Sequence, residues 1–213
     1  MTDSEKLYKI IIEKDIKAFK EWLEKGGNPN SIAGKPGFDG TLLLLEVVMQ
    51  IDEPEDDAPL VEMMRLLIEK GADVNAVAND NDYSALYWVV SENRPAMAKL
   101  LLDAGADVDF RTDTGDTPLV VAMENECWEM VETLLAYASP ETINKWGGIY
   151  CNTPLGMAFR TANLPMVELL LQHGADPQAY DPDEDSTINN VWKVKDIGMQ
   201  EKIYALIEKY KKI

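Results

Sequence analysis

The sequence is poor in the residues that carry most enzyme chemistry. Its 213 residues include one histidine, His173, and two cysteines, Cys127 and Cys151. A zinc site needs three or four ligands of the histidine, cysteine or carboxylate type, and a serine–histidine–acid triad needs a positioned histidine. Phosphate-binding loops of the GxxxxGK[ST] and GxGxxG types are also absent. We therefore expect no catalytic residues, no metal site and no cofactor, in a protein that is not an enzyme.

Long hydrophobic runs are missing as well. The longest candidate, residues 42–49, is interrupted by Glu46, whereas a membrane-spanning helix needs about 20 apolar residues. The first five residues are polar and acidic, without the basic region and apolar core of a secretory signal. Two thiols in a chain of this size suit a reducing compartment. These features predict a cytoplasmic protein that does not bind a membrane.

Basic residues are scarce relative to acidic ones. Twenty Lys and Arg stand against 38 Asp and Glu, which gives a formal net charge of −18 and a pI near 4.4. Proteins that bind nucleic acids neutralise phosphates with Lys and Arg, so we expect no nucleic-acid partner. The negative electrostatic field of such a protein raises the rate at which it encounters a basic protein. An equally open alternative is that the acidity only keeps the chain soluble.

What the sequence does contain is a repeated string. An apolar segment followed by Gly-Ala-Asp recurs at Gly71, Gly105 and Gly174, at spacings of 34 and 69 residues. A degenerate copy contains Gly26. A second degenerate copy, in which Ala138 replaces the glycine, lies between Gly105 and Gly174. The period is therefore about 34 residues, which indicates a repeat architecture.

A second sequence marker recurs with about the same period as the first. Ser84-Ala-Leu, Thr117-Pro-Leu and Thr153-Pro-Leu recur at spacings of 33 and 36 residues. A Ser or Thr hydroxyl accepts from the free N–H groups at a helix start, and proline is tolerated at the first helical position. Each marker therefore predicts the start of a short helix. A second helix with apolar residues at helical spacing follows, and the glycine supplies the left-handed conformation that ends it.

The two markers together resemble those of the ankyrin-repeat family, whose unit of about 33 residues carries a TPLHxA signature. The resemblance implies an all-α ankyrin-repeat solenoid of stacked helix–turn–helix units with β-hairpin fingers, about six units including caps. We expect one domain, residues 1–213, divided into an N-terminal cap at 5–38, internal repeats at 39–81, 82–114, 115–150 and 151–184, and a C-terminal cap at 185–213.

The chain departs from the family pattern in two places. The signature histidine is replaced by Tyr87, Val120 or Gly156, so we expect order between repeats to come from packing more than from the hydrogen bond of that histidine. The second unit is about nine residues longer than the others, with an acidic insertion at residues 50–59. The insertion is either a solvated loop or part of a binding face.

In the ankyrin family, partners bind the concave side, which is made by the finger tips and the exposed edges of the first helices. Carried over position by position, this implies the partner-binding residues Asp80, Asn81, Tyr83, Glu92, Arg111, Asp113, Asp116, Glu124, Trp146, Ile149, Tyr150, Arg160, Tyr180 and Asp183. Exposed aromatic side chains among carboxylates are typical of a surface that selects a basic protein. In the alternative interpretation, Trp146 and Tyr150 fold back and fill the core of the next repeat.

Two functional hypotheses follow. The first is a non-enzymatic, monomeric protein–protein interaction module that binds a protein partner, expected to be basic, on its concave finger and inner-helix face. The second is an acidic inhibitor of the immunity or antitoxin type that blocks a basic toxin or nuclease. Association that slows steeply with added salt favours the second hypothesis, since screening weakens electrostatic steering.

Overall fold

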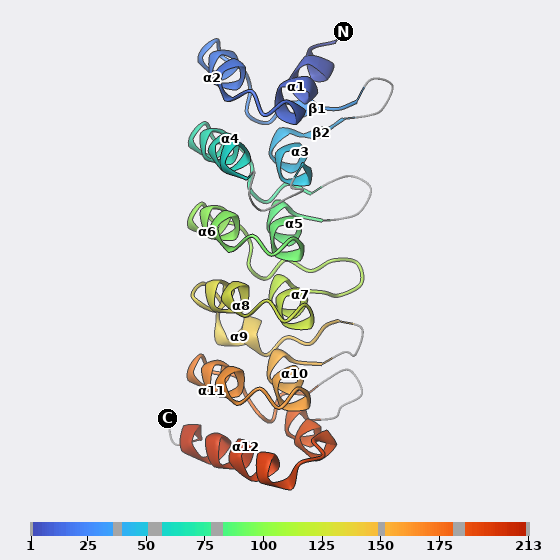
Figure 1. Cartoon of the computed structure of the whole chain (residues 1–213), viewed down its shortest axis with the longest axis vertical. Coiled ribbons are helices and arrows are strands. Elements are labelled where there is room, and N and C mark those ends of the chain that lie inside the picture. The colour runs from blue at the N-terminus through green and yellow to red at the C-terminus, as the bar shows by residue number, and fades with distance from the viewer. Residues whose placement is uncertain are drawn as a thin grey trace. The chain divides into compact units, whose positions relative to one another are not determined.

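The computed structural model describes residues 2–35, 40–50, 57–77, 83–148, 152–180 and 186–211. The chain divides into two compact units, residues 1–107 and 108–213, and each unit is built from helix pairs (Figure 1). Within the described ranges, no helix is long and apolar enough to cross a membrane.

The first unit contains three helix pairs and a short hairpin. In Figure 1, α1, α3 and α5 form one row of this unit and α2, α4 and α6 form the other. The two strands pair antiparallel, with Ile32 opposite Leu42 and Ala33 opposite Thr41. The elements are α1 (Asp3–Ile12), α2 (Ile16–Glu24), β1 (Ile32–Ala33), β2 (Thr41–Leu42), α3 (Leu43–Met49), α4 (Ala58–Glu69), α5 (Ala85–Ser91) and α6 (Pro95–Asp103).

The second unit contains two complete pairs, a one-turn helix and a C-terminal cap. Helix α10 packs against α7, α11 and the 3₁₀ helix η2, and α12 packs against α11. The elements are α7 (Pro118–Glu124), α8 (Trp128–Leu135), α9 (Pro140–Ile143), α10 (Pro154–Arg160), α11 (Leu164–Gln172), η2 (Thr187–Lys193) and α12 (Ile197–Tyr210).

Helix starts and ends follow the chemistry expected from the sequence. The hydroxyls of Thr117 and Thr153 accept from the backbone N–H three residues further on, at 3.3 and 3.1 Å. The prolines that follow them are the first residues of α7 and α10. Gly71, Gly105 and Gly174 have φ of 85°, 88° and 93°, the left-handed conformation that ends a helix. These predicted caps and stops are confirmed.

Burial differs between the two helices of a pair. Residues 118–123 of α7 and 154–159 of α10 are all buried. In α8, only a stripe that includes Met130, Val131 and Leu134 is buried, as expected for a helix with one side toward the core. A single pair would leave its apolar face in water, so stacking against the next pair stabilises both.

Asparagine side chains also link consecutive repeats within each unit. Asn75 Nδ2 donates to Gly105 O at 3.1 Å, and Asn75 Oδ1 accepts from Asp107 N at 2.7 Å. Asn30 and Asn144 make the same two bonds to the equivalent turns ahead of them. The expectation that packing replaces the missing histidine bond was therefore incomplete, because these side-chain bonds also fix the register between neighbouring repeats.

One helix was not predicted. Residues Pro140–Ile143 form α9, which starts with a capping box between Ser139 and Thr142. It follows the second degenerate copy of the repeated string, and Ala138 is not among the residues with positive φ. Without a glycine to reverse the chain, Ser139 and Pro140 start a new helical turn instead.

The last two residues of the insertion expected at residues 50–59 belong to a helix. Helix α4 begins at Ala58 and includes Pro59, so it has 12 residues where α6 has nine. Proline is well tolerated in the first turn of a helix, which explains this extension. Just before it, Asp57 Oδ2 lies 2.7 Å from Arg94 Nε, and both side chains are mostly buried. The rest of the acidic run, residues 51–56, lies outside the described residues.

The asparagine link in the first unit can be tested by removing it. Asn75→Ala leaves the Gly105 carbonyl and the Asp107 N–H to water, so we expect the free energy of unfolding to fall by about 1 kcal/mol. Asn125→Ala is the control, since the Asn125 side chain is exposed and does not link two repeats among the described residues. Urea denaturation measures both. Equal stability of the two variants would contradict a registering role for Asn75.

Helix α3 buries one carboxylate. Glu46 is only 7% exposed, and its Oε1 accepts a hydrogen bond from Gln50 Nε2 at 2.8 Å. Burial raises the pKa of Glu46 above its ordinary value of 4.5, against smaller opposing effects of Gln50 and Lys35. Since the folded state then holds this proton more tightly than the unfolded state does, the stability contributed by Glu46 is present below pH 4.5 and is lost as pH rises through the folded pKa.

This linkage predicts opposite effects for two neutralised glutamates. Glu46→Gln should raise the free energy of unfolding at pH 7, because it removes a buried charge. Glu62→Gln should lower it, because Lys20 holds the pKa of Glu62 below its ordinary value and that carboxylate stabilises the fold when ionised. Urea denaturation of both variants between about pH 4 and pH 8 measures the difference. If Glu46→Gln instead lowers the free energy of unfolding at pH 7, then burial of the ionised Glu46 carboxylate does not destabilise the fold.

Candidate functional site

The structure places the sequence-predicted binding residues in two separate sets, one in each unit. Tyr83 and Glu92 belong to the first unit. Seven others belong to the second unit: Arg111, Asp113, Asp116, Glu124, Trp146, Arg160 and Tyr180. Five lie outside the described residues: Asp80, Asn81, Ile149, Tyr150 and Asp183.

In the first unit, Tyr83 is part of an aromatic cluster at the start of α5. Its ring stacks on Tyr87 with centroids 4.4 Å apart and an interplanar angle of 4°. It also meets Trp88 edge-on at 6.1 Å. All three side chains are half-buried, so the cluster stiffens the junction between finger and helix while one part of it faces solvent. Glu92 is the C-cap of α5 and is half-buried.

In the second unit, Arg111 joins two fingers. Its Nε donates to Gly115 O at 3.0 Å, and its Nη2 donates to Trp146 O at 2.9 Å. The guanidinium carbon also lies 4.8 Å from the centroid of the Trp146 ring, a distance typical of a cation–π contact. Trp146 is half-buried, and its ring is held against Arg111 of the preceding finger.

Asp116 fixes the same fingers from the other side. Its Oδ1 accepts from Gly148 N at 2.7 Å, and its Oδ2 accepts from the Thr114 hydroxyl at 2.8 Å. Its own N–H donates to Thr112 Oγ1 at 3.0 Å. These bonds assign Asp116 a positioning role within the fingers. Asp113 is exposed, and Tyr180, at 63% exposure, is the most exposed finger aromatic in the described residues.

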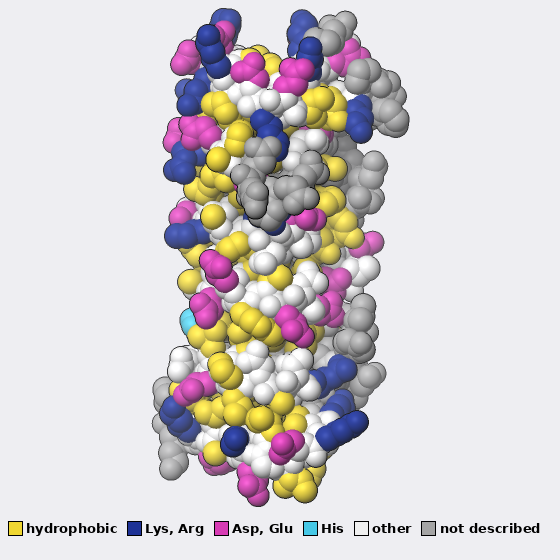
Figure 2. Space-filling view, in the orientation of Figure 1, with side chains coloured by type: hydrophobic (Ala, Val, Ile, Leu, Met, Phe, Trp, Pro, Cys, Tyr) yellow, Lys and Arg dark blue, Asp and Glu magenta, His cyan; other side chains and the backbone are white. Residues whose placement is uncertain are grey.

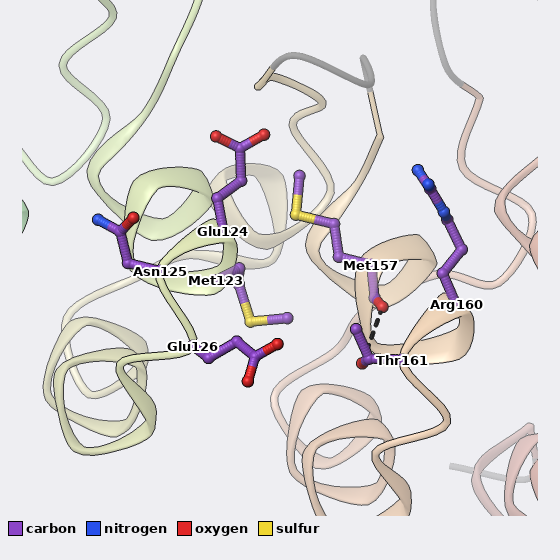
Figure 3. Close-up of a pocket in the computed structure, with 7 residues that line it drawn as sticks. All are labelled: Met123, Glu124, Asn125, Glu126, Met157, Arg160 and Thr161. Carbon is purple, nitrogen blue, oxygen red and sulfur yellow. Dashed lines mark hydrogen bonds between the residues drawn. The ribbon is translucent and has the colours of Figure 1, made fainter.

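A groove lies beside these fingers, between the C-terminal ends of α7 and α10. Its volume is about 520 Å³, and Met123, Glu124, Asn125, Glu126, Met157, Arg160 and Thr161 line it (Figure 3). Met123 and Met157 are 4% and 8% exposed, so they form an apolar floor. Glu124, Glu126 and Arg160 are exposed and form a charged rim. In Figure 3, Glu124, Met157 and Arg160 extend to the same side of the two helices.

The finger comes close to the Glu124 carboxylate. Gly148 has φ of +75°, and a Cβ at this position would clash with Glu124 Oε1. The left-handed backbone favours glycine here, and the end of the flexible Glu124 side chain occupies the space that a Cβ would fill. The finger that Asp116 and Arg111 hold in place thus lies next to Glu124 at the rim.

Sequence reasoning found the ionic part of this groove and missed the apolar part. Glu124 and Arg160 were among the predicted binding residues, whereas Met123 and Met157 were not. Each methionine lies on a short helix whose other residues are nearly all buried, and in such a helix an apolar residue signals core. Glu126, in the turn between α7 and α8, was missed because nothing in the repeat markers singles it out.

Metal-binding and reactive groups were also located. Among the described residues, no group of three or more His, Cys, Asp or Glu side chains could hold a metal ion. Cys127 is half-buried, and burial raises the pKa of its thiol, which disfavours the reactive thiolate. His173 is the C-cap of α11 and does not line the groove.

Charge on the surface is mixed. Over the described part of the visible face, Figure 2 shows acidic, basic and hydrophobic side chains interleaved. On this face, the described residues therefore do not form a patch of one sign.

Two family models match the sequence. One, described as "Ankyrin repeats (many copies)", matches residues 61–102, and the other, described as "Ankyrin repeats (3 copies)", matches residues 107–181. Together they cover more than half of the chain.

Similar curated proteins contain a related region within longer chains. NF-kappa-B inhibitor alpha of Homo sapiens is 32% identical over 131 residues, which cover 60% of this chain and 41% of that protein. Palmitoyltransferase ZDHHC13 of Homo sapiens is 31% identical over 130 residues, or 61% of this chain and 15% of that protein. A putative ankyrin repeat-containing protein of Treponema pallidum (strain Nichols) is 36% identical over 87 residues, or 40% of this chain and 29% of that protein. The matches thus span less than half the length of each relative.

A solved structure shows the fold over nearly the whole chain. The ankyrin repeat domain of Bcl-3, described as a unique member of the IkappaB protein family, superposes with a TM-score of 0.69 at 23% identity. The match covers 95% of this chain and 84% of that chain. The predicted ankyrin-repeat solenoid is thereby confirmed, and with the repeat markers and both family models it establishes that this chain belongs to the ankyrin-repeat family.

Proposed function

We propose that this chain is a non-enzymatic interaction protein that holds a protein partner on the finger and first-helix side of its second unit. The observation that carries the proposal is the groove between α7 and α10, which combines a buried methionine floor with an exposed charged rim. Apolar surface with a few positioned polar groups is the usual composition of a recognition site. Ankyrin repeats are protein–protein interaction modules, which supports the same conclusion.

The charge balance supports a basic partner. Two of the three charged residues at the groove are carboxylates, and the chain as a whole carries −18. Such a field raises the rate of encounter with a basic protein and repels nucleic acid and anionic membranes. We accordingly propose a monomeric, cytoplasmic protein without a nucleic-acid or membrane partner, in keeping with its two cysteines.

An inhibitor of a basic toxin or nuclease is the second candidate. The acidic surplus favours it, because carboxylates of an inhibitor can occupy the sites at which such an enzyme holds phosphates. The name of NF-kappa-B inhibitor alpha shows that one relative acts as an inhibitor. In that case the electrostatic field of the whole acidic chain would drive association, and the association rate would fall steeply as salt is added. Recognition at the groove would depend instead on particular side chains.

A charge-matched pair of variants separates local recognition from the overall field. Glu124→Lys and Glu129→Lys both change the net charge by two, but only Glu124 lines the groove. Each full-length variant serves as bait in a lysate of the source organism, and quantitative mass spectrometry compares the captured proteins with those of the unchanged chain. We expect Glu124→Lys to reduce capture of the partner about tenfold or more, and Glu129→Lys to leave it nearly unchanged.

Thermal unfolding and circular dichroism verify that both baits remain folded. Equal losses in both variants would identify the overall field as the cause and favour the inhibitor. Equal retention in both variants, or no specific capture by the unchanged chain, would overturn the proposed site.

A further inference from the structure

One carboxylate in the first unit is buried without an opposite charge beside it. Glu46 is 7% exposed, and in the described part of the chain it is the only buried side chain that can ionise. The residues around it on α3, from Leu43 to Val48, are buried as well. Its Oε1 accepts from Gln50 Nε2 at 2.8 Å. Its Oε2 has neither a hydrogen bond nor an ion pair with any described residue.

The position of Glu46 is apolar in the other repeats. Helices α3, α5, α7 and α10 each have seven residues. Their fourth residues are Glu46, Trp88, Val121 and Met157. In α10 this fourth residue lines the groove of the second unit, so the position can contribute to a surface that a partner reaches. The carboxylate of α3 is therefore a departure from the repeat pattern at a position suited to recognition.

We expect the ionised Glu46 to destabilise the fold. Burial is the largest effect on its pKa and raises it, and a buried charge without an opposite charge costs free energy at neutral pH. Gln50 compensates in part, through one hydrogen bond from the next turn of the same helix. A charged side chain that destabilises its own fold is a candidate for a role in binding.

Two exposed aliphatic side chains accompany this carboxylate. Met49 is 42% exposed and lies three residues after Glu46 on α3, and residues at this spacing share one side of a helix. Ile12 is 45% exposed and ends α1, as Met49 ends α3. Because α1 packs against α3, these equivalent ends are neighbours. Ile12, Glu46 and Met49 thus combine a recessed carboxylate with exposed apolar surface.

The basic residues of the same region do not pair with Glu46. Lys9 stands three residues before Ile12, as Glu46 stands before Met49, and its Nζ lies 3.6 Å from Glu13 Oε1. Lys35, which follows β1, is exposed and lowers the pKa of Glu46 by less than burial raises it. A cation from outside the chain would therefore meet a carboxylate that is not yet neutralised.

A lysine suits this arrangement. Its methylene groups can lie on Ile12 and Met49 while its ammonium reaches the recessed carboxylate. One oxygen of Glu46 already accepts from Gln50. A compact ammonium needs only the other oxygen, whereas the planar fork of an arginine is best matched by two free oxygens.

We propose that Ile12, Glu46 and Met49 form a docking site for a lysine of a protein partner, whose ammonium pairs with Glu46 Oε2. Apolar residues next to the lysine contact Ile12 and Met49. The net charge of −18 favours the approach of such a basic segment. This site lies in the first unit and shares no residue with the groove of the second unit, so it goes beyond the proposed function.

Two short peptides that differ by one charge test the site. The full-length chain, labelled with ¹³C at the methionine methyl and glutamate carboxyl groups, is titrated with acetyl-Leu-Lys-Leu-amide. Acetyl-Leu-norleucine-Leu-amide keeps the aliphatic side chain and lacks the ammonium. We expect the lysine peptide to shift the Met49 signal, to lower the titration midpoint of Glu46, and to bind about tenfold more tightly than the norleucine peptide.

Three variants complete the experiment. Met49→Leu assigns the Met49 signal. Glu46→Gln assigns the Glu46 signal and should abolish the preference for the lysine peptide while the free energy of unfolding rises at pH 7, so that damage to the fold cannot explain the loss. Glu69→Gln removes one charge from the exposed end of α4 and should keep the preference.

Several outcomes would overturn the proposed lysine site. Equal binding of the two peptides is one, and an unchanged preference in Glu46→Gln is another. If Lys35→Gln raises the Glu46 midpoint as far as the peptide lowers it, Lys35 already neutralises the carboxylate. If the Met49 signal moves with protein concentration alone, a second copy of the chain occupies the surface instead. These outcomes leave the proposed function intact, since that is tested at Glu124, and its failure would equally leave the lysine site standing.

Discussion

Burial of one helix pair against the next is the constraint on which this structure depends. Helix α10 is buried from Pro154 to Phe159 because α7, α11 and η2 all pack against it. A pair without neighbours would expose that surface, and its short helices are far below the length at which isolated helices are stable. Stability therefore comes from contact between repeats, and the asparagine links fix the register at which those contacts form.

The groove is a consequence of the same stacking. Helices α7 and α10 are neighbours in register, and the ends of both carry charged residues where the chain turns. Met123 and Met157 line the space between the two helices, and Gly148 of the finger lies close to Glu124. The groove thus arises without any special element, from the side chains at the helix ends of an ordinary repeat.

The repeat markers predicted most of the fold for a physical reason. Thr117, Thr153 and the three glycines act on their own local backbone, and local effects can be read from sequence. The extra helix α9 was missed because its signal, Ser139 followed by Pro140, stands where the repeat pattern calls for a turn. The lengthening of α4 was missed because an acidic run reads as a loop, although Pro59 suits the first turn of a helix.

The candidate site was predictable only in part. The binding positions of the ankyrin family, carried over to this sequence, predicted Glu124 and Arg160, and both line the groove. They also predicted Asp116 and Trp146, whose contacts in the structure join the fingers. A contact such as that of Arg111 on Trp146 joins residues 35 positions apart, and no local pattern encodes it. Met123 and Met157 look like core residues in the sequence because they are nearly core residues in the structure. Their partial access to the groove follows from how two repeats meet.

The central claim is that a protein partner sits on the groove between α7 and α10. Hydrogen–deuterium exchange of the full chain, alone and with the captured partner, tests it most directly. The account predicts that residues 120–127 and 157–162 gain protection, while the outer helix segments 129–135 and 165–172 keep the exchange rates of the free chain. Protection confined to the outer helices, with residues 120–127 and 157–162 unchanged, would contradict it.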